Sequence, residues 1–325
     1  MARSFDISKK LVWQAYLRVK ANKGAEGIDG QTIEDFEQNL KGNLYRIWNR
    51  MTSGSYVPPA VKAVTIPKRS GGRRVLGIPT ISDRIAQTVV KMYLEPELEP
   101  FFHEDSYGYR PGKSAIQAVS ITRERCWKYG WLFEFDIKGA FDNIDHSLLT
   151  RALQKHTDCE WVLLYINRWL IAPMQHPNGD QEQRAKGTPQ GGVVSPLLMN
   201  LFLHYVFDKW MAVHEPRLRF ARYADDAVVH CPTLREAERL RVVLEQRFRE
   251  CNLELHPEKS KIVCCKGNLP WIDYPVNKFE FLGYEFRLRT AVNRQGRRFV
   301  RFMPAISPSS AKAIRKEIRS WSVQN

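Results

Sequence analysis

Two adjacent aspartates, Asp225 and Asp226, follow one stretch of strand-forming residues and precede another. The flanking runs, 219–223 and 227–230, predict a hairpin whose tight turn carries both carboxylates. Asp pairs in turns are commonly structural, because aspartate hydrogen-bonds its own backbone there. Here both flanks are apolar, so the turn would hold negative charge at the edge of a core, which is costly unless a cation compensates it.

A third carboxylate, Asp136, stands at the end of another short apolar run, 131–137. Antiparallel pairing that brought Asp136 beside Asp225 would make a cluster of hard oxygen ligands suited to Mg²⁺. Two such ions about 4 Å apart can clamp the attacking and leaving oxygens of a phosphoryl transfer. Spacing alone does not give this pairing, so the metal site is a hypothesis at this point.

The elements that must position these residues mix helices with strands. Helical periodicity and capping residues predict helices over 8–19, 32–51, 82–93 with Ser82 as N-cap, 114–127, 146–155, 160–170, 195–213, 234–249 and 311–321. Strand-forming composition predicts strands over 61–66, 73–78, 131–137, 219–223, 227–230, 262–265 and 279–286. This interleaving indicates an α+β fold with an antiparallel sheet.

The charge of the chain favours a polyanionic partner. Fifty Lys and Arg against thirty-five Asp and Glu give a net charge of +15 over 325 residues. Each phosphate that a basic side chain neutralises releases condensed counterions, which drives nucleic-acid binding. One basic cluster brackets a Gly-Gly turn within residues 62–74, and another fills residues 284–325. A solvated basic surface is the alternative explanation for either cluster.

The cysteines and the lack of long apolar segments argue against a disulfide-rich secreted protein and against a membrane protein. The six cysteines have neither paired CxxC spacing nor the pattern of a small secreted domain, which argues against a zinc site or a disulfide framework. No apolar stretch approaches the length of a membrane span, and the first residues lack the apolar segment of a secretion signal. We therefore expect no membrane association and a cytoplasmic location.

The aspartate hairpin and six further motifs resemble reverse transcriptases. Tyr223-Ala224-Asp225-Asp226 resembles the catalytic hairpin of that family, and the other blocks follow in the family's order along most of the chain. They are Ile66-Pro67-Lys68 with Leu76-Gly77-Ile78-Pro79-Thr80, residues 106–112, residues 135–142, Gly187-Thr188-Pro189-Gln190-Gly191-Gly192, residues 255–261, and Phe281-Leu282-Gly283-Tyr284. The 187–192 block and the extension with residues 23–30 resemble group II intron proteins in particular.

The resemblance implies a role for each motif residue. Asp136, Asp225 and Asp226 would be catalytic and would hold two Mg²⁺ ions, with the Ile137 carbonyl as a further ligand. Residues of the nucleotide site would be Lys68 and Arg74 at the triphosphate, Phe141 beneath the sugar, Gln190 in the pocket and Lys259 as proton donor to pyrophosphate. Leu282 and Gly283 would grip the primer. From the residues alone, Phe141 fits an ordinary core position and Lys259 a solvated lysine equally well.

The resemblance also implies an organisation into domains. The fold would be the fingers and palm of a right-hand polymerase, with an antiparallel palm sheet packed on helices and an N-terminal helical extension. We expect the extension over 1–60, fingers over 61–130, palm over 131–290 with fingers elements between 145 and 185, and the start of a thumb or maturase domain over 291–325. Group II intron proteins continue through a full thumb, so we expect this chain to hold only its first helix.

The implied activity is RNA-directed DNA synthesis on an RNA template with a DNA primer and dNTPs. The full-length protein would also bind its intron RNA and assist intron splicing and mobility. The sequence does not decide whether the protein forms a homodimer. Two alternatives are a non-catalytic RNA-binding maturase fragment and a reverse transcriptase of retron, diversity-generating or CRISPR-associated lineage. Three converging acids in a cationic protein favour catalysis over simple RNA binding.

Overall fold

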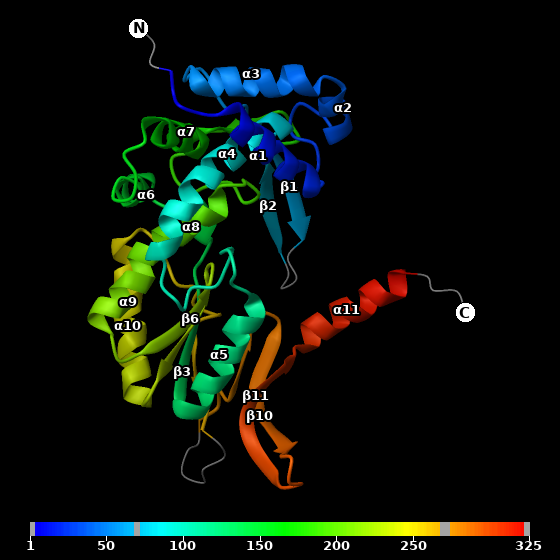
Figure 1. The fold of residues 1–325 in the computed structure, drawn as a ribbon. Coiled ribbons are helices and arrows are strands. Elements are labelled where there is room, and N and C mark those ends of the chain that lie inside the picture. The colour runs from blue at the N-terminus through cyan, green and yellow to red at the C-terminus, as the bar shows by residue number, and fades with distance from the viewer. Residues whose placement is uncertain (1–3, 68–71, 267–273, 322–325) are drawn as a thin grey trace. The chain divides into compact units, whose positions relative to one another are not determined.

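The computed structural model describes residues 4–67, 72–266 and 274–321. The chain forms two compact units, and each of them combines two separate stretches of sequence. Unit 1 consists of residues 1–102 and 139–202, and unit 2 consists of residues 103–138 and 203–325. Figure 1 shows the elements of both units in chain order. None of the described helices is both long and apolar enough to cross a membrane.

Unit 1 is mainly helical. Its helices are α1 (Lys9–Ala21), α2 (Ile33–Gln38), α3 (Leu40–Thr52), α4 (Ile81–Leu98), α6 (His146–Leu153), α7 (Glu160–Ile171) and α8 (Ser195–Leu203), with short 3₁₀ turns at Glu99–Phe101 and Ala140–Asp142. The centre of the unit is α4, whose buried Asp83 accepts hydrogen bonds from Tyr56 and Trp169 at 2.9 and 2.7 Å. Burial raises the pKa of Asp83 to about 6, and these donors oppose the rise.

A four-stranded sheet in unit 1 has the order β2-β1-β4-β5. The strands are β1 (Val61–Pro67), β2 (Arg73–Ile78), β4 (Met174–Gln175) and β5 (Gln181–Glu182). β1 pairs with β2 in antiparallel and with β4 in parallel fashion. Because side chains alternate across a strand, the register places Arg73, Val75, Gly77, Met174 and Glu182 on one face.

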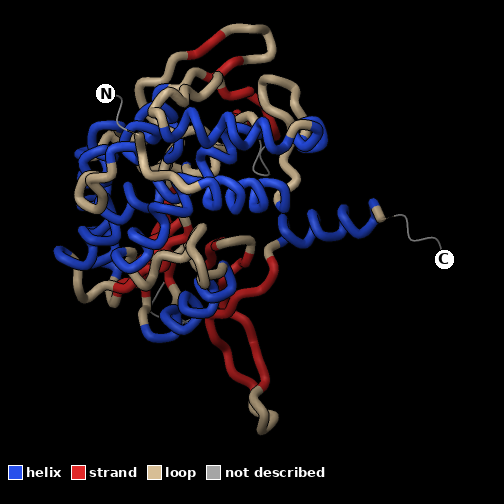
Figure 2. The backbone as a smooth tube through the Cα atoms, turned by 45° about the horizontal axis from the view of Figure 1, so that its top comes forward, coloured by secondary structure: helices blue, strands red, loops and turns tan. Residues whose placement is uncertain are grey.

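Unit 2 is built around a second four-stranded sheet with the order β6-β7-β3-β8. Its helices are α5 (Ala115–Lys128), α9 (Lys209–His214), α10 (Leu234–Glu250) and α11 (Pro308–Ser320), with a π-helical segment at His204–Asp208. Its strands are β3 (Trp131–Asp136), β6 (Arg219–Tyr223), β7 (Asp226–Cys231), β8 (Lys261–Cys264), β9 (Lys278–Phe281), β10 (Tyr284–Val292) and β11 (Arg298–Ile306). The long β10–β11 hairpin and α11 are distinct in Figure 2.

The two faces of the unit 2 sheet pack on different partners. Leu132 belongs to a core that includes residues of α5 and the phenylalanines of β9, β10 and β11. Phe135 points to the opposite face, where its ring lies 5.4 Å from that of Phe207 and 5.6 Å from that of Phe248 in α10. Glu134 and Asp136 alternate with Phe135 and therefore share the face of Leu132. Figure 1 shows α5 and α10 covering this sheet from different sides.

The predicted elements are present, with four local differences. The helix expected over 32–51 is divided at Asn39, whose backbone leaves the helical region (φ −129°, ψ 50°). The N-cap of α4 is Thr80 instead of Ser82. The helix expected over 195–213 contains the π-helical segment, and the strand expected over 279–286 is a hairpin of β9 and β10. Strands β4, β5 and β11 were not predicted, because β4 and β5 contain two residues each and β11 lacks strict alternation.

Candidate active site

Strands β3 and β7 bring two of the three predicted catalytic carboxylates directly opposite each other. Asp136, the last residue of β3, pairs with Asp226, the first residue of β7. The sequence led us to expect Asp225 beside Asp136, but Asp225 lies one residue earlier, in the two-residue loop that joins β6 to β7. The other loop residue, Ala224, has a positive φ of 56°. That conformation costs a residue with a Cβ about 1 kcal/mol, so the loop stores local strain beside the carboxylates.

A buried ion pair between Arg222 and Asp208 is hydrogen-bonded to this loop. The Arg222 guanidinium donates through Nε and Nη2 to the two carboxylate oxygens of Asp208, at 2.7 and 2.6 Å. It also donates to the Ala224 carbonyl at 3.0 Å and to Ser106 Oγ at 2.8 Å. Arg222 and Asp208 are 1% and 0% exposed, so both charges depend on each other for compensation.

The segment around Gly108 packs directly on the same loop. The Tyr107 N–H donates to the Arg222 carbonyl at 2.8 Å, and the Arg222 N–H donates to the Asp105 carbonyl at 3.0 Å. A Cβ on Gly108 would stand only 2.4 Å from the backbone nitrogen of Ala224. Glycine at position 108 therefore allows the backbones to approach closely enough to fix the position of the carboxylate turn.

Burial and mutual repulsion raise the pKa values of several acids near the turn. Burial raises the pKa of Asp226 well above its usual range, and the charges of Glu134 and Asp225 raise it further. Burial also raises the pKa of Asp225, and the charge of Asp136 adds to that effect. Glu134, two residues before Asp136 on the same face, has its pKa raised to about 7 by burial, although Lys261 opposes the rise.

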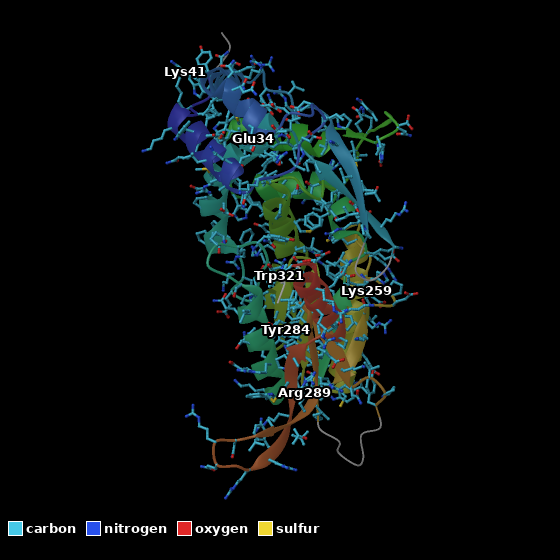
Figure 3. The ribbon with its side chains drawn as sticks, turned by 90° about the vertical axis from the view of Figure 1, so that its right-hand side faces the viewer. Glu34, Lys41, Lys259, Tyr284, Arg289 and Trp321 are labelled. Carbon is cyan, nitrogen blue, oxygen red and sulfur yellow. The ribbon has the colours of Figure 1, made fainter. Side chains whose placement is uncertain are left out.

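Two lysines lie beside these acids and offset part of their charge. Lys259 Nζ lies 2.5 Å from an Asp136 oxygen, and Lys261 Nζ lies 3.2 Å from Glu134. Lys259 is labelled in Figure 3. Within residues 4–67, 72–266 and 274–321, no three His, Cys, Asp or Glu side chains converge closely enough to hold a metal ion. The donor chemistry nevertheless fits a hard dication, because Asp136 and Asp226 are carboxylates on directly opposed strand residues and burial disfavours the ionisation of Asp225 and Asp226.

Unit 2 also holds Ile137 and the β9–β10 turn, to which the sequence resemblance gives roles as metal ligand and primer grip. Ile137 is buried and forms an isolated antiparallel bridge with Leu255, which ties the end of β3 to the segment that carries Lys259. Leu282 and Gly283 form the two-residue turn between β9 and β10, with positive φ of 52° and 81°. The Gly283 carbonyl accepts from the Ser307 N–H at 3.0 Å, so this turn contacts the start of α11.

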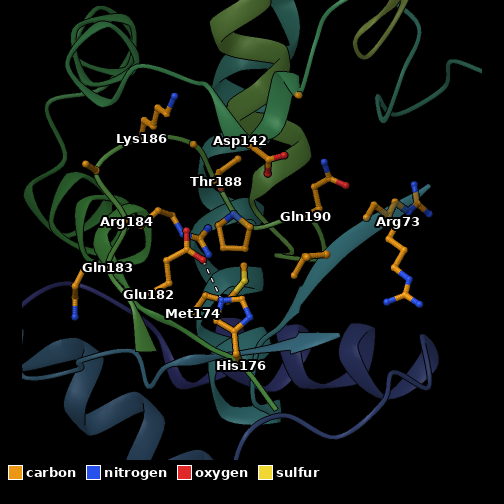
Figure 4. A pocket seen from close by; sticks show the side chains of 16 residues that line it. Arg73, Asp142, Met174, His176, Glu182, Gln183, Arg184, Lys186, Thr188 and Gln190 are labelled. Atoms are coloured by element: carbon orange, nitrogen blue, oxygen red, sulfur yellow. Dashed lines mark hydrogen bonds and ion pairs between the residues drawn. The ribbon is translucent and has the colours of Figure 1, made fainter. Parts of the chain in front are cut away.

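Unit 1 contains a pocket of about 580 Å³ that includes two predicted nucleotide-site residues, Arg74 and Gln190. Its floor is the face of the sheet that carries Arg73, Val75, Met174 and Glu182, and its wall is the loop 183–190 (Figure 4). The loop is held on the sheet because the Gly77 N–H donates to the Gln190 carbonyl at 2.7 Å.

Helix α4 also anchors the far end of this loop. Gln87 donates to Asp83 at 2.9 Å and accepts from the Val193 N–H at 2.8 Å, which links the buried carboxylate of α4 to the loop backbone. Phe141 contacts the loop through its carbonyl, which accepts from the Thr188 N–H at 2.8 Å. Phe141 is not among the residues that line the pocket. Lys68 lies outside the described residues.

Sequence reasoning missed several of the residues that hold these sites. Arg222 and Asp208 were not singled out, although a charged residue inside the strand Phe-Ala-Arg-Tyr and an acid inside the apolar run 195–213 were visible signals. Arg184, which lines the unit 1 pocket, was not singled out either. It lies in a polar stretch, 178–186, whose composition resembles an ordinary exposed loop.

The chain is similar in sequence to known proteins. The sequence pattern of the reverse transcriptase (RNA-dependent DNA polymerase) family matches residues 66–286. The group II intron-encoded protein LtrA of Lactococcus lactis subsp. cremoris is 31% identical over 256 residues, which are 78% of this chain and 41% of LtrA. Protein YkfC of Escherichia coli K12 is 32% identical over 286 residues, with 74% of each chain covered.

A solved structure supports the fold. Telomerase from Candida albicans, in complex with a fragment of telomeric RNA, matches with a TM-score of 0.55 and 13% identity over 78% of this chain and 48% of that one. The fold is thus that of a right-hand polymerase, as predicted. The chain belongs to the reverse transcriptase family and, within it, to the group II intron-encoded reverse transcriptases and maturases. It spans about two fifths of the length of LtrA.

Proposed function

We propose that this chain carries out RNA-directed DNA synthesis by metal-assisted nucleotidyl transfer. The observation that supports this most directly is the opposition of Asp136 and Asp226 at the end of the β3–β7 pair, with Asp225 in the adjoining loop. The raised pKa values of Asp225 and Asp226, in a protein of net charge +15, support a site that binds cations and a polyanionic substrate.

Asp136, Asp225 and Asp226 would hold two Mg²⁺ ions, with the Ile137 carbonyl as a further ligand. When bound, these ions would stabilise the attacking and leaving oxygens of the transferred phosphoryl group. Lys259, now paired with Asp136, would be in position to give a proton to the departing pyrophosphate. Leu282 and Gly283 would hold the primer end through their tight turn.

The unit 1 pocket would take the incoming dNTP. Arg74 and Lys68 would contact the triphosphate, because guanidinium and ammonium groups bind phosphate oxygens strongly. Gln190 would line the base and sugar side of the pocket, and Phe141 would exclude a 2′-hydroxyl by its bulk. In this assignment, residues 1–60 are the N-terminal extension, 61–130 the fingers, 131–290 the palm with fingers elements between 145 and 185, and 291–325 the start of the thumb.

The protein's partners would be an RNA template, a DNA primer and intron RNA. The name of LtrA describes an intron-encoded protein, and by analogy the full-length form of this protein would assist splicing and mobility of its own intron. A homodimer and a cytoplasmic location are compatible with this proposal.

A second candidate function is RNA binding without catalysis. It is favoured by one observation: the described acids do not form a ready-made group of three metal ligands, and Lys259 already pairs with Asp136. Such a protein would bind structured intron RNA through its basic surfaces, and its affinity would fall steeply with salt.

Primer extension distinguishes the two functions. The chain and its Asp225→Ala variant would be given an RNA template with an annealed DNA primer, dNTPs and Mg²⁺. Extension by the native chain that disappears in the variant and after EDTA treatment would support polymerisation. Absence of extension, together with salt-sensitive RNA binding that Asp225→Ala leaves unchanged, would favour the RNA-binding function.

A further inference from the structure

The unit 1 pocket contains a buried arginine nitrogen whose role the proposed function does not explain. Arg184 lines the pocket, and its Nη2 atom is buried without a hydrogen-bond partner among the described residues. A buried N–H donor without an acceptor costs about 1–3 kcal/mol, and more when the group is charged. Native structures rarely retain such a donor unless a ligand, ion or water receives it.

The acids near Arg184 do not remove this requirement. Glu182 forms an ion pair with His176, at 3.0 Å between Nε2 and the carboxylate, as the dashed line in Figure 4 marks. The charges of Asp142 and Glu182 favour the protonated guanidinium, while burial, the larger effect, lowers the pKa of Arg184. An arginine stays protonated even so. The result is a partly buried guanidinium whose Nη2 donor has no acceptor among the described residues.

The rest of the pocket is suited to an anion. Its four cationic side chains, Arg73, Arg74, Arg184 and Lys186, outnumber its two acidic ones, Asp142 and Glu182. Figure 4 shows Arg184 on one side of the pocket with Glu182 and His176, and Arg73 and Gln190 on the other side. The volume of about 580 Å³ is within the range of small-ligand sites and is enough for a nucleotide's phosphates.

We propose that Arg184 binds phosphate oxygens of a nucleoside triphosphate, and of the pyrophosphate released from it, in this pocket. This inference rests on the proposed function for its ligand, and it adds a binding residue outside the motifs that resemble the family. The planar guanidinium can offer two parallel N–H donors to a phosphate, which a lysine cannot do.

Calorimetric titration of the full chain with inorganic pyrophosphate and, separately, with dGTP tests the proposal. Native chain, Arg184→Gln and Arg184→Lys would be compared, with Arg151→Gln as the matched control because Arg151 is an exposed arginine on α6 of the same unit. Loss of a charge-assisted hydrogen bond should weaken both ligands about 10- to 100-fold in Arg184→Gln and less in Arg184→Lys. Arg151→Gln should bind like the native chain.

The outcomes separate this inference from the proposed function. If the native chain binds neither ligand, or if both Arg184 variants bind as Arg151→Gln does, Arg184 is not a phosphate-binding residue. If Arg184→Gln does not fold, as judged by circular dichroism, the affinity of Arg184→Lys decides alone. Arg184-dependent binding without primer extension would uphold the phosphate site and reject polymerisation. If the native chain does extend primers, Arg184→Gln should raise the KM for dNTP about 10-fold or more.

Discussion

Asp136 and Asp226 face each other as a directly opposed pair at the end of two antiparallel strands. Opposed residues on one face of a sheet have Cβ atoms about 5 Å apart, so like charges there repel. The repulsion is part of the reason that the pKa of Asp226 is raised, after the larger effect of burial. The folded chain therefore carries a cost at this position that a bound cation would relieve.

Replacing Asp226 should stabilise the chain in a pH-dependent way. A carboxyl whose pKa is raised by folding is bound to its proton more tightly in the folded state, so its ionisation reduces stability. Well below pH 4 the carboxyl is protonated in both states, and Asp226→Asn should have the same melting temperature offset from the native chain at every such pH. As pH rises from about 4, the usual pKa of aspartate, up to the raised folded-state pKa, only the native chain loses stability, so the variant should melt a few degrees higher at about pH 8 without divalent cations.

Thermal melts between these pH values check this, with Asp6→Asn, an exposed aspartate, as control. A variant that melts below the native chain at the higher pH would contradict the charge argument. Mg²⁺ should raise the melting temperature of the native chain more than that of Asp226→Asn, because only the native chain has the full set of carboxylates.

Breaking the buried Arg222–Asp208 pair should destabilise unit 2 strongly. Arg222→Leu leaves Asp208 as an uncompensated buried charge, which typically costs about 3–5 kcal/mol. The more exposed pair Arg241–Glu245, with a contact of 3.0 Å and side chains 45% and 31% exposed, is the control, and Arg241→Gln should cost about 1 kcal/mol or less. Urea unfolding measures both, and equal losses from the two substitutions would reject the role given to burial.

Gly108→Ala should reduce activity more than stability. Its new Cβ would meet the backbone of Ala224 at 2.4 Å and would displace the carboxylate turn. Gly112→Ala is the control from the same segment: Gly112 has a positive φ of 70° but nothing within 4 Å of a Cβ, so it should lose only about 1 kcal/mol of stability. Primer extension should show the larger loss of rate for Gly108→Ala, and melting should show some loss of stability in both variants, because the clash at Gly108 must displace backbone.

Lys259→Met separates a counterion from a proton donor. Removing the partner of Asp136 should lower the Mg²⁺ concentration needed for half-maximal rate, because a cation no longer competes with the lysine. If Lys259 also protonates pyrophosphate, the rate at saturating Mg²⁺ should fall by on the order of 100-fold. Lys278→Met, at an exposed lysine of the same unit, should change neither quantity. If the rate at saturating Mg²⁺ is unchanged in Lys259→Met, Lys259 acts only as a counterion to Asp136 and not as a proton donor.

The sequence predicted the kinds of elements better than their pairing. Residues 219–223 and 227–230 predicted a hairpin, and the structure has it as β6 and β7. The register opposite Asp136 could not be predicted, because Asp225 and Asp226 are both carboxylates and a slip of one residue exchanges them. The β9–β10 turn was missed because Leu282 adopts a positive φ that its side chain disfavours, which gives no turn signal beyond Gly283.

Site residues that lie within one local sequence motif could be predicted. Residues that contact the site only through tertiary packing could not. The carboxylates and the 187–192 loop lie in local motifs, so their types and spacing identify them. Arg222 and Asp208 meet only because β6 and the π-helical segment pack together, and pattern reading gives no such contact. Arg184 is similar, since the pocket that it lines forms only where the loop 183–190 lies beside residues of β2, β4 and β5.

The interleaved course of the chain also sets an order of events during synthesis on the ribosome. β3 emerges first, but its neighbours β7 and β8 begin only about 90 and 125 residues after its end. At the usual rates of translation, β3 waits on the order of ten seconds with both hydrogen-bonding edges unsatisfied. An apolar strand in that state is a template for mispairing with other chains, so this interval is the one in which the nascent chain is most exposed to aggregation.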